Sequence, residues 1–147
     1  MEYDFEKLAR EITAERLRDL SGAPAAAAEI AAKIIASAVN STKDHHGERI
    51  TVVGVCRGVM TGLVMIDKEL PDAAIAILQR MTTLAQELHL DPMETMTWAM
   101  EGIAAVAVVS QAEAKNAIRG RIDERFMGAG EIFGRLCEEA SARTTGS

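Results

Sequence analysis

Apolar residues recur along this chain at helical spacing, with charged residues between them. In residues 4–20, for example, Phe5, Leu8, Ile12 and Leu17 follow the 3.6-residue period of an α-helix. Similar segments follow, at 24–40, 48–69, 71–90, 92–118 and 125–140. No segment indicates a strand. The pattern predicts an all-α bundle of five or six helices, forming a single domain over residues 1–140, with a frayed tail at 141–147.

Glycine and proline mark the expected helix ends. Gly22 is suited to the left-handed position that closes the first helix. Pro71 is suited to the first turn of the helix expected at 71–90. Asp91 is expected to cap the helix that begins at Pro92, because an aspartate side chain can accept the free N–H groups of a first turn. Gly120 is expected to bend or break the chain after residue 118.

The segment 48–69 has glycine at every fourth position: Gly54, Gly58 and Gly62. Each glycine costs about 0.8–1 kcal/mol relative to alanine inside a helix. All three fall on one arc of a helix that is apolar on nearly every side, so this helix is predicted to be central and largely buried. Their cost is offset if another backbone approaches closely on that arc.

Later helices also have small faces, which could meet the glycine arc. Gly102 is followed by several alanines, and Gly130 and Gly134 repeat the four-residue spacing. All six glycines are therefore predicted to lie at sites of close helix packing, either within the chain or across a two-fold interface between copies.

Composition limits the partners. Net charge is −6, which disfavours nucleic acid and anionic membranes. The longest apolar run, 50–66, is shorter than the ~20 residues that span a bilayer and contains Arg57, which disfavours a membrane span. Cys56 and Cys137 fit two buried free thiols in a reducing compartment, and the charged start does not resemble a signal peptide. A cytoplasmic location is predicted.

One loop has residues that could bind a divalent metal ion: Asp44, His45, His46 and Glu48. No Cys/His spacing supports a closed zinc site, and the Glu-x-x-His pairs of di-iron bundles are missing. A solvated loop explains the same residues, and no cofactor is predicted.

Residues 84–100, LAQELHLDPMETMTWAM, look like a helix-turn-helix of the DNA-binding kind. The second helix, however, has Glu94 and Glu101 and no Lys or Arg before Lys115. His89 also occupies the turn position where glycine is usual. A plain helical hairpin explains the pattern equally.

No catalytic constellation stands out, so the chain is predicted not to be an enzyme. The leading hypothesis is a small helical protein that acts by association, as a homodimer or as an accessory subunit. A ligand- or metal-binding protein using the 44–48 loop is the alternative, and a DNA-binding protein using residues 84–100 is the second.

Overall fold

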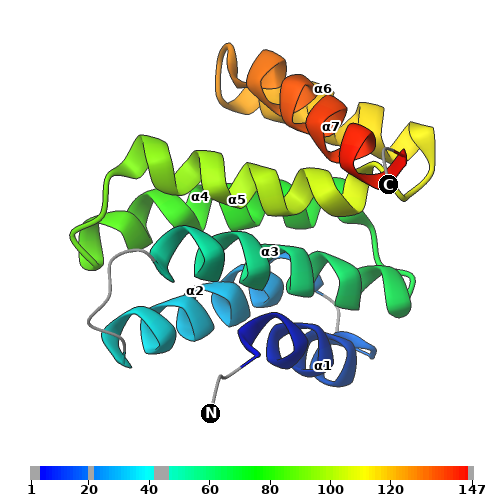
Figure 1. Ribbon diagram of the computed structural model, residues 1–147. Coiled ribbons are helices and arrows are strands. Elements are labelled where there is room, and N and C mark those ends of the chain that lie inside the picture. Colours follow the sequence, from blue (N-terminus) through cyan, green and yellow to red (C-terminus); the bar gives the residue numbers. More distant parts are fainter. Residues whose placement is uncertain (1–3, 20–21, 42–46, 146–147) are drawn as a thin grey trace.

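The computed structural model describes residues 4–19, 22–41 and 47–145. These residues contain no strand and form seven α-helices, shown in Figure 1: α1 (Phe5–Leu17), α2 (Ala23–Ser41), α3 (Gly47–Met65), α4 (Leu70–Glu87), α5 (Pro92–Ala107), α6 (Ala112–Arg125) and α7 (Ala129–Thr145). The predicted all-α class is confirmed, and the described helices number seven where five or six were expected.

The additional helix arises because the segment expected at 92–118 is divided into α5 and α6. The N–H groups of Val109 and Ser110 donate to the carbonyls three residues earlier, which tightens the end of α5 into a turn. Gly120 was expected to break the chain, but it lies inside α6, and the bend comes at Gly128, whose φ is +87°. Helix α7 then continues through 141–145, which were expected to belong to a frayed tail.

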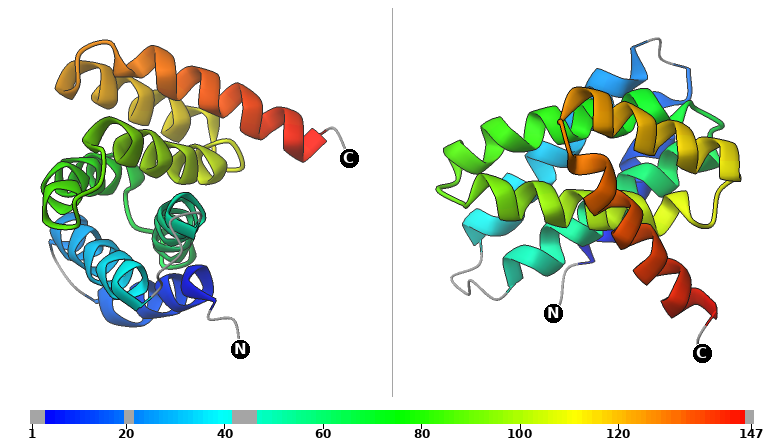
Figure 2. Two further views of the ribbon diagram at one scale, coloured as in Figure 1. Left: turned by 60° about the vertical axis from the view of Figure 1, so that its left-hand side comes forward. Right: turned by 90° about the horizontal axis from the view of Figure 1, so that it is seen from above.

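Helix α3, like α4 and α5, contacts four other helices. It packs against α1, α2, α4 and α5. Helices α1 and α2 lie on one side of it, and the α6–α7 hairpin lies on the far side of α4 and α5 (Figures 1 and 2). The C-terminal part of α7 extends beyond the bundle, as Figure 2 shows.

Capping side chains begin two of the helices. Asp4 accepts a hydrogen bond of 2.9 Å from the N–H of Lys7 at the start of α1. Asp91 accepts from the N–H groups of Met93 and Glu94, at 2.8 and 3.1 Å, and Pro92 is the first residue of α5. The predicted cap at Asp91 is confirmed.

The core is aliphatic, as the low aromatic content leads one to expect. Val59 and Leu63 of α3 and Ile77 and Leu78 of α4 are fully buried, and Phe133 of α7 is the largest fully buried side chain. Among the described helices, none combines the length and the apolar character needed to cross a membrane.

Candidate interaction site

The glycine arc of α3 faces α1. A Cβ built on Gly58 would overlap the carbonyl oxygen of Glu6, and one built on Gly62 would lie 2.7 Å from the carbonyl oxygen of Arg10. Both contacts are with backbone, which cannot move aside as a side-chain end can. The small residues Ala9 and Thr13 of α1 lie against the same two glycines. The backbone admitted by Gly58 and Gly62 therefore belongs to the same chain.

Gly102 and Gly54 have different surroundings. A Cβ on Gly102 would lie 2.5 Å from the carbonyl oxygen of Val53, so α5 and α3 also approach closely. At Gly54 the nearest atoms belong to the Glu6 side chain and are 3.7 Å away, which leaves room for a methyl group. Gly54 thus lies on the arc, but its surroundings would also accept alanine.

Gly130 and Gly134 of α7 face side chains of α6. A Cβ on Gly130 would lie 2.7 Å from Cβ of Asp123, and one on Gly134 would lie 2.8 Å from Cζ of Arg119. These glycines close the α6–α7 hairpin. All the close approaches seen at the six glycines are made within the chain, so an interaction surface has to be sought elsewhere.

A groove of about 980 Å³ lies where α3 and α5 end and α4 and α6 begin. Leu70 and Val106 are buried at its base. Val64 and Val109 line it and remain exposed, at 47% and 68%. The sequence predicted a helix at 48–69 that is buried on nearly every side. Val64 departs from that prediction because none of the described helices covers this end of α3.

The turns beside the groove explain why it stays open. Helix α3 closes with hydrogen bonds from the N–H of Lys68 to the carbonyl of Leu63, at 3.0 Å, and from the N–H of Asp67 to that of Val64, at 3.1 Å. Asp67 takes the left-handed conformation, with φ of 57°. At the end of α5, the tight turn projects Val109 into solvent. Two helix ends thus each leave a valine uncovered.

The rim of the groove is predominantly acidic. Four carboxylates line it, from Asp67, Glu69, Asp72 and Glu113, together with the cations of Lys68 and Arg121. Arg121 forms an ion pair of 2.7 Å with Asp72, so these two charges offset each other. The remaining lining groups carry an excess of negative charge.

A second polar cluster ties helices together. Arg57 of α3 forms a two-pronged ion pair with Glu6 of α1, with 3.0 Å between Nε and Oε2. The hydrogen bonds that Arg57 donates to Glu6 are the largest cause that raises the pKa of Arg57, while burial opposes it. Arg49 pairs with Glu101 of α5 at 3.0 Å. Both arginines belong to α3, and each is bound by a carboxylate from another helix. This cluster therefore links α1 and α5 to α3.

The two cysteines lie free and buried. Burial raises the pKa of Cys56 to about 12, so its thiol stays protonated at neutral pH. The pKa of Cys137 is also raised, mainly by burial and against the nearby charges of Lys115 and Arg119. Neither thiol has the lowered pKa of a nucleophile.

The metal-binding hypothesis cannot be placed in the fold. Asp44, His45 and His46 lie outside the described residues, and Glu48 belongs to the first turn of α3. Within the described ranges, no three His, Cys, Asp or Glu side chains are grouped as a metal site requires. The hypothesis stays a prediction.

The segment resembling a helix-turn-helix forms the end of α4, a turn and α5. His89 has the left-handed conformation, with φ of 57°, that a glycine would usually take there. Along α5, Thr95, Ala99 and Ile103 are buried, because α3, α4 and α7 pack around this helix. One buried face is compatible with a recognition helix, whose opposite face enters the DNA major groove. The DNA-binding hypothesis therefore stays a prediction.

Comparison of the chain with protein-family models, curated proteins and solved structures gives no match.

Proposed function

We propose that this protein acts without catalysis, by association with another protein chain through the groove between α3, α4, α5 and α6. The observation that carries the proposal is the pair of exposed valines, Val64 and Val109, above a buried apolar base. An apolar groove with a charged rim is a form that protein recognition commonly takes.

The energetic gain from covering this groove is substantial. Fully burying a valine stabilises by about 1.5–3 kcal/mol relative to full exposure. With Val64 47% and Val109 68% exposed, covering both would contribute about 2 kcal/mol. Each 1.4 kcal/mol changes a binding constant tenfold, so these two side chains alone affect affinity measurably.

The partner is either a second copy, which makes the protein a homodimer, or another protein to which this chain is an accessory subunit. A cytoplasmic location belongs to the same proposal. The glycine arc, which first suggested self-association, does not support it, because α1 already covers Gly58 and Gly62.

Light-scattering mass over a range of protein concentrations tests self-association. The informative variant is Val64→Gln/Val109→Gln, and its control is Ile50→Gln/Met93→Gln, which changes two side chains that are 76% and 72% exposed outside the groove. A homodimer formed through the groove would have the mass of two chains in the wild type and the control, and of one chain in the groove variant. A dimer that persists in the groove variant would contradict the proposed surface.

A further inference from the structure

We infer that the groove binds a cationic amphipathic segment of another protein rather than a second copy of this chain; this inference rests on the proposed function. The observation behind this inference is that the groove combines an apolar base with an acidic rim. Apolar side chains of such a segment would contact Val64, Val106 and Val109. Its Lys or Arg side chains would reach the carboxylates of the rim.

The charges of the rim indicate the sign of the charge that the binding segment must carry. Asp67, Glu69 and Glu113 are exposed and line the groove. Since Arg121 is held by Asp72, Lys68 is the remaining cation among the lining residues, and a net negative charge is left. The whole chain adds to this field, with a net charge of −6. Complementary potentials accelerate encounter and suppress partners of like charge. A cationic segment is therefore attracted both by the groove and by the whole molecule.

Symmetry argues against a second copy. A two-fold dimer is isologous, so each surface patch meets the same patch on its partner. A dimer through this groove would bring two rims together, each with more carboxylates than cations. The two exposed valines favour such contact, but the excess negative charge of the rim opposes it at close range.

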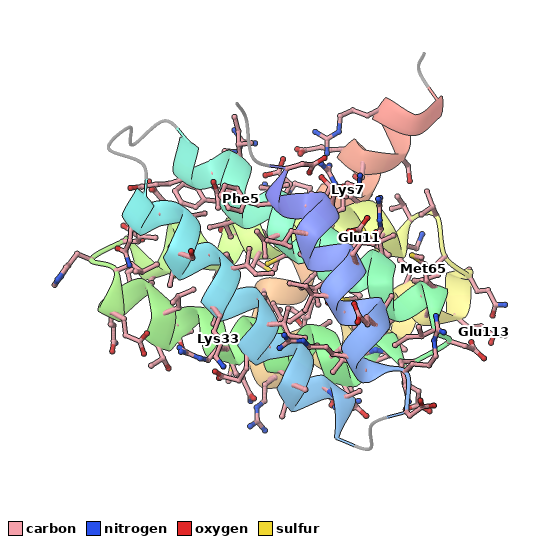
Figure 3. All side chains as sticks on the ribbon, turned by 90° about the horizontal axis from the view of Figure 1, so that it is seen from below. Phe5, Lys7, Glu11, Lys33, Met65 and Glu113 are labelled. Carbon is pink, nitrogen blue, oxygen red and sulfur yellow. The ribbon has the colours of Figure 1, made fainter. Side chains whose placement is uncertain are left out.

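The position of the groove suits a docking segment. It lies at the helix ends, where Glu113 is in the first turn of α6 and Met65 ends α3. Figure 3 shows these two residues at the same end of the molecule. Met65 is itself 63% exposed, which extends the apolar surface near the groove. A volume of about 980 Å³ admits several side chains.

The test uses synthetic peptides and the full chain. A fluorescent amphipathic Leu/Lys peptide of about 18 residues is titrated with protein, and binding is followed by anisotropy at low and high salt. A Leu/Glu peptide of the same pattern is the charge-inverted probe. We expect the Leu/Lys peptide to bind with an affinity that falls as salt rises, and the Leu/Glu peptide not to bind.

Two matched triple variants locate the binding. Asp67→Asn/Glu69→Gln/Glu113→Gln removes the three rim charges, and Asn tolerates the left-handed backbone of position 67. The control, Glu94→Gln/Glu124→Gln/Glu139→Gln, removes three exposed charges that do not line the groove. The rim variant is expected to weaken Leu/Lys binding about five- to tenfold relative to the control. Equal weakening in both variants would show attraction to net charge only and would overturn the inference.

The two double variants used for light scattering also test the contribution of the exposed valines to peptide binding. Val64→Gln/Val109→Gln is expected to weaken Leu/Lys binding at least as strongly as the rim variant, and Ile50→Gln/Met93→Gln to leave it unchanged. Circular dichroism and melting curves confirm that each variant is folded before it is titrated.

The outcomes separate the inference from the proposed function. A wild-type dimer that dissociates in the groove variant would overturn the inference that a cationic segment binds there. It would support the proposed function, because the groove would then join two copies of the chain. A monomeric chain that binds neither peptide would contradict both. Binding of both peptides with equal affinity would also overturn the inference, since the rim would then not select for charge.

Discussion

Gly54 and Gly58 are four residues apart on one helix, yet only Gly58 is required by its surroundings. We expect Gly54→Ala to stabilise the protein by about 0.8–1 kcal/mol, because alanine is the better helix former and a Cβ there would have only 3.7 Å contacts. Gly58→Ala is expected to destabilise it by about 1–3 kcal/mol, since the new methyl group would overlap the Glu6 carbonyl. Urea unfolding of both variants measures the two changes. Changes of the same sign would contradict the close contact between α1 and α3.

Thr13 contains a buried hydroxyl without a hydrogen-bond partner among the residues that the structure describes. Valine has the same shape, so Thr13→Val is expected to raise the free energy of unfolding by about 1 kcal/mol by removing the unpaired group. Thr95 is the matched control: it is equally buried, but its Oγ1 donates to the Asp91 carbonyl at 2.8 Å. Thr95→Val is expected to destabilise. Thermal melts compare the pair, and a loss of stability in Thr13→Val would show that its hydroxyl is satisfied in solution.

The elements were predicted best where a side chain acts on its own helix end. Asp91 and Pro92 begin α5 as expected, since an N-cap depends only on adjacent residues. The turn at 108–111 was missed because its sequence, VVSQ, contains neither glycine nor proline, the strongest turn signals. Gly120 was misassigned because a single glycine is tolerated inside a helix.

The turn after α4 contains a strained residue, His89. The N–H of Leu90 donates to the carbonyl of Ala85 at 2.8 Å, which leaves His89 with a left-handed backbone that costs a non-glycine residue roughly 1–2 kcal/mol. His89→Gly is expected to stabilise by about 0.5–1 kcal/mol, because the larger entropy of an unfolded glycine offsets part of the gain. His89→Ala, which keeps the strain, serves as the control. Chemical denaturation should rank the glycine variant above the wild type, and a ranking with alanine first would contradict the assigned backbone.

At the scale of the whole molecule, the candidate site could not be read from the sequence. Val64 and Val109 both lie in apolar runs typical of buried helices. They become exposed because two helix ends meet where no other helix of the described ranges covers them. This arrangement depends on contacts between segments far apart in the chain. The small residues of the glycine arc were recognisable, but periodicity alone does not show which backbone they admit.

The arrangement of the helices also predicts how the bundle opens. The α6–α7 hairpin contacts only α4 and α5 among the other described helices, whereas α3 packs against four helices. Cys137 lies on that hairpin, and Cys56 lies fully buried on α3. Regions with fewer contacts open at lower free energy than the core. The hairpin is therefore expected to separate from the bundle before α3 is exposed.

Alkylation by iodoacetamide, followed by peptide mass spectrometry, can detect this order of opening. We expect Cys137 to be modified faster than Cys56 in native buffer, with a rate that rises only weakly with urea. Modification of Cys56 should instead follow global unfolding, because its thiol is both enclosed and, with a pKa of about 12, protonated while the core is intact. Since both side chains are thiols, different urea dependences report on opening rather than on chemistry. Equal urea dependences at the two sites would mean that α6 and α7 unfold only with the entire bundle, and that the helices beside the groove form one cooperative unit.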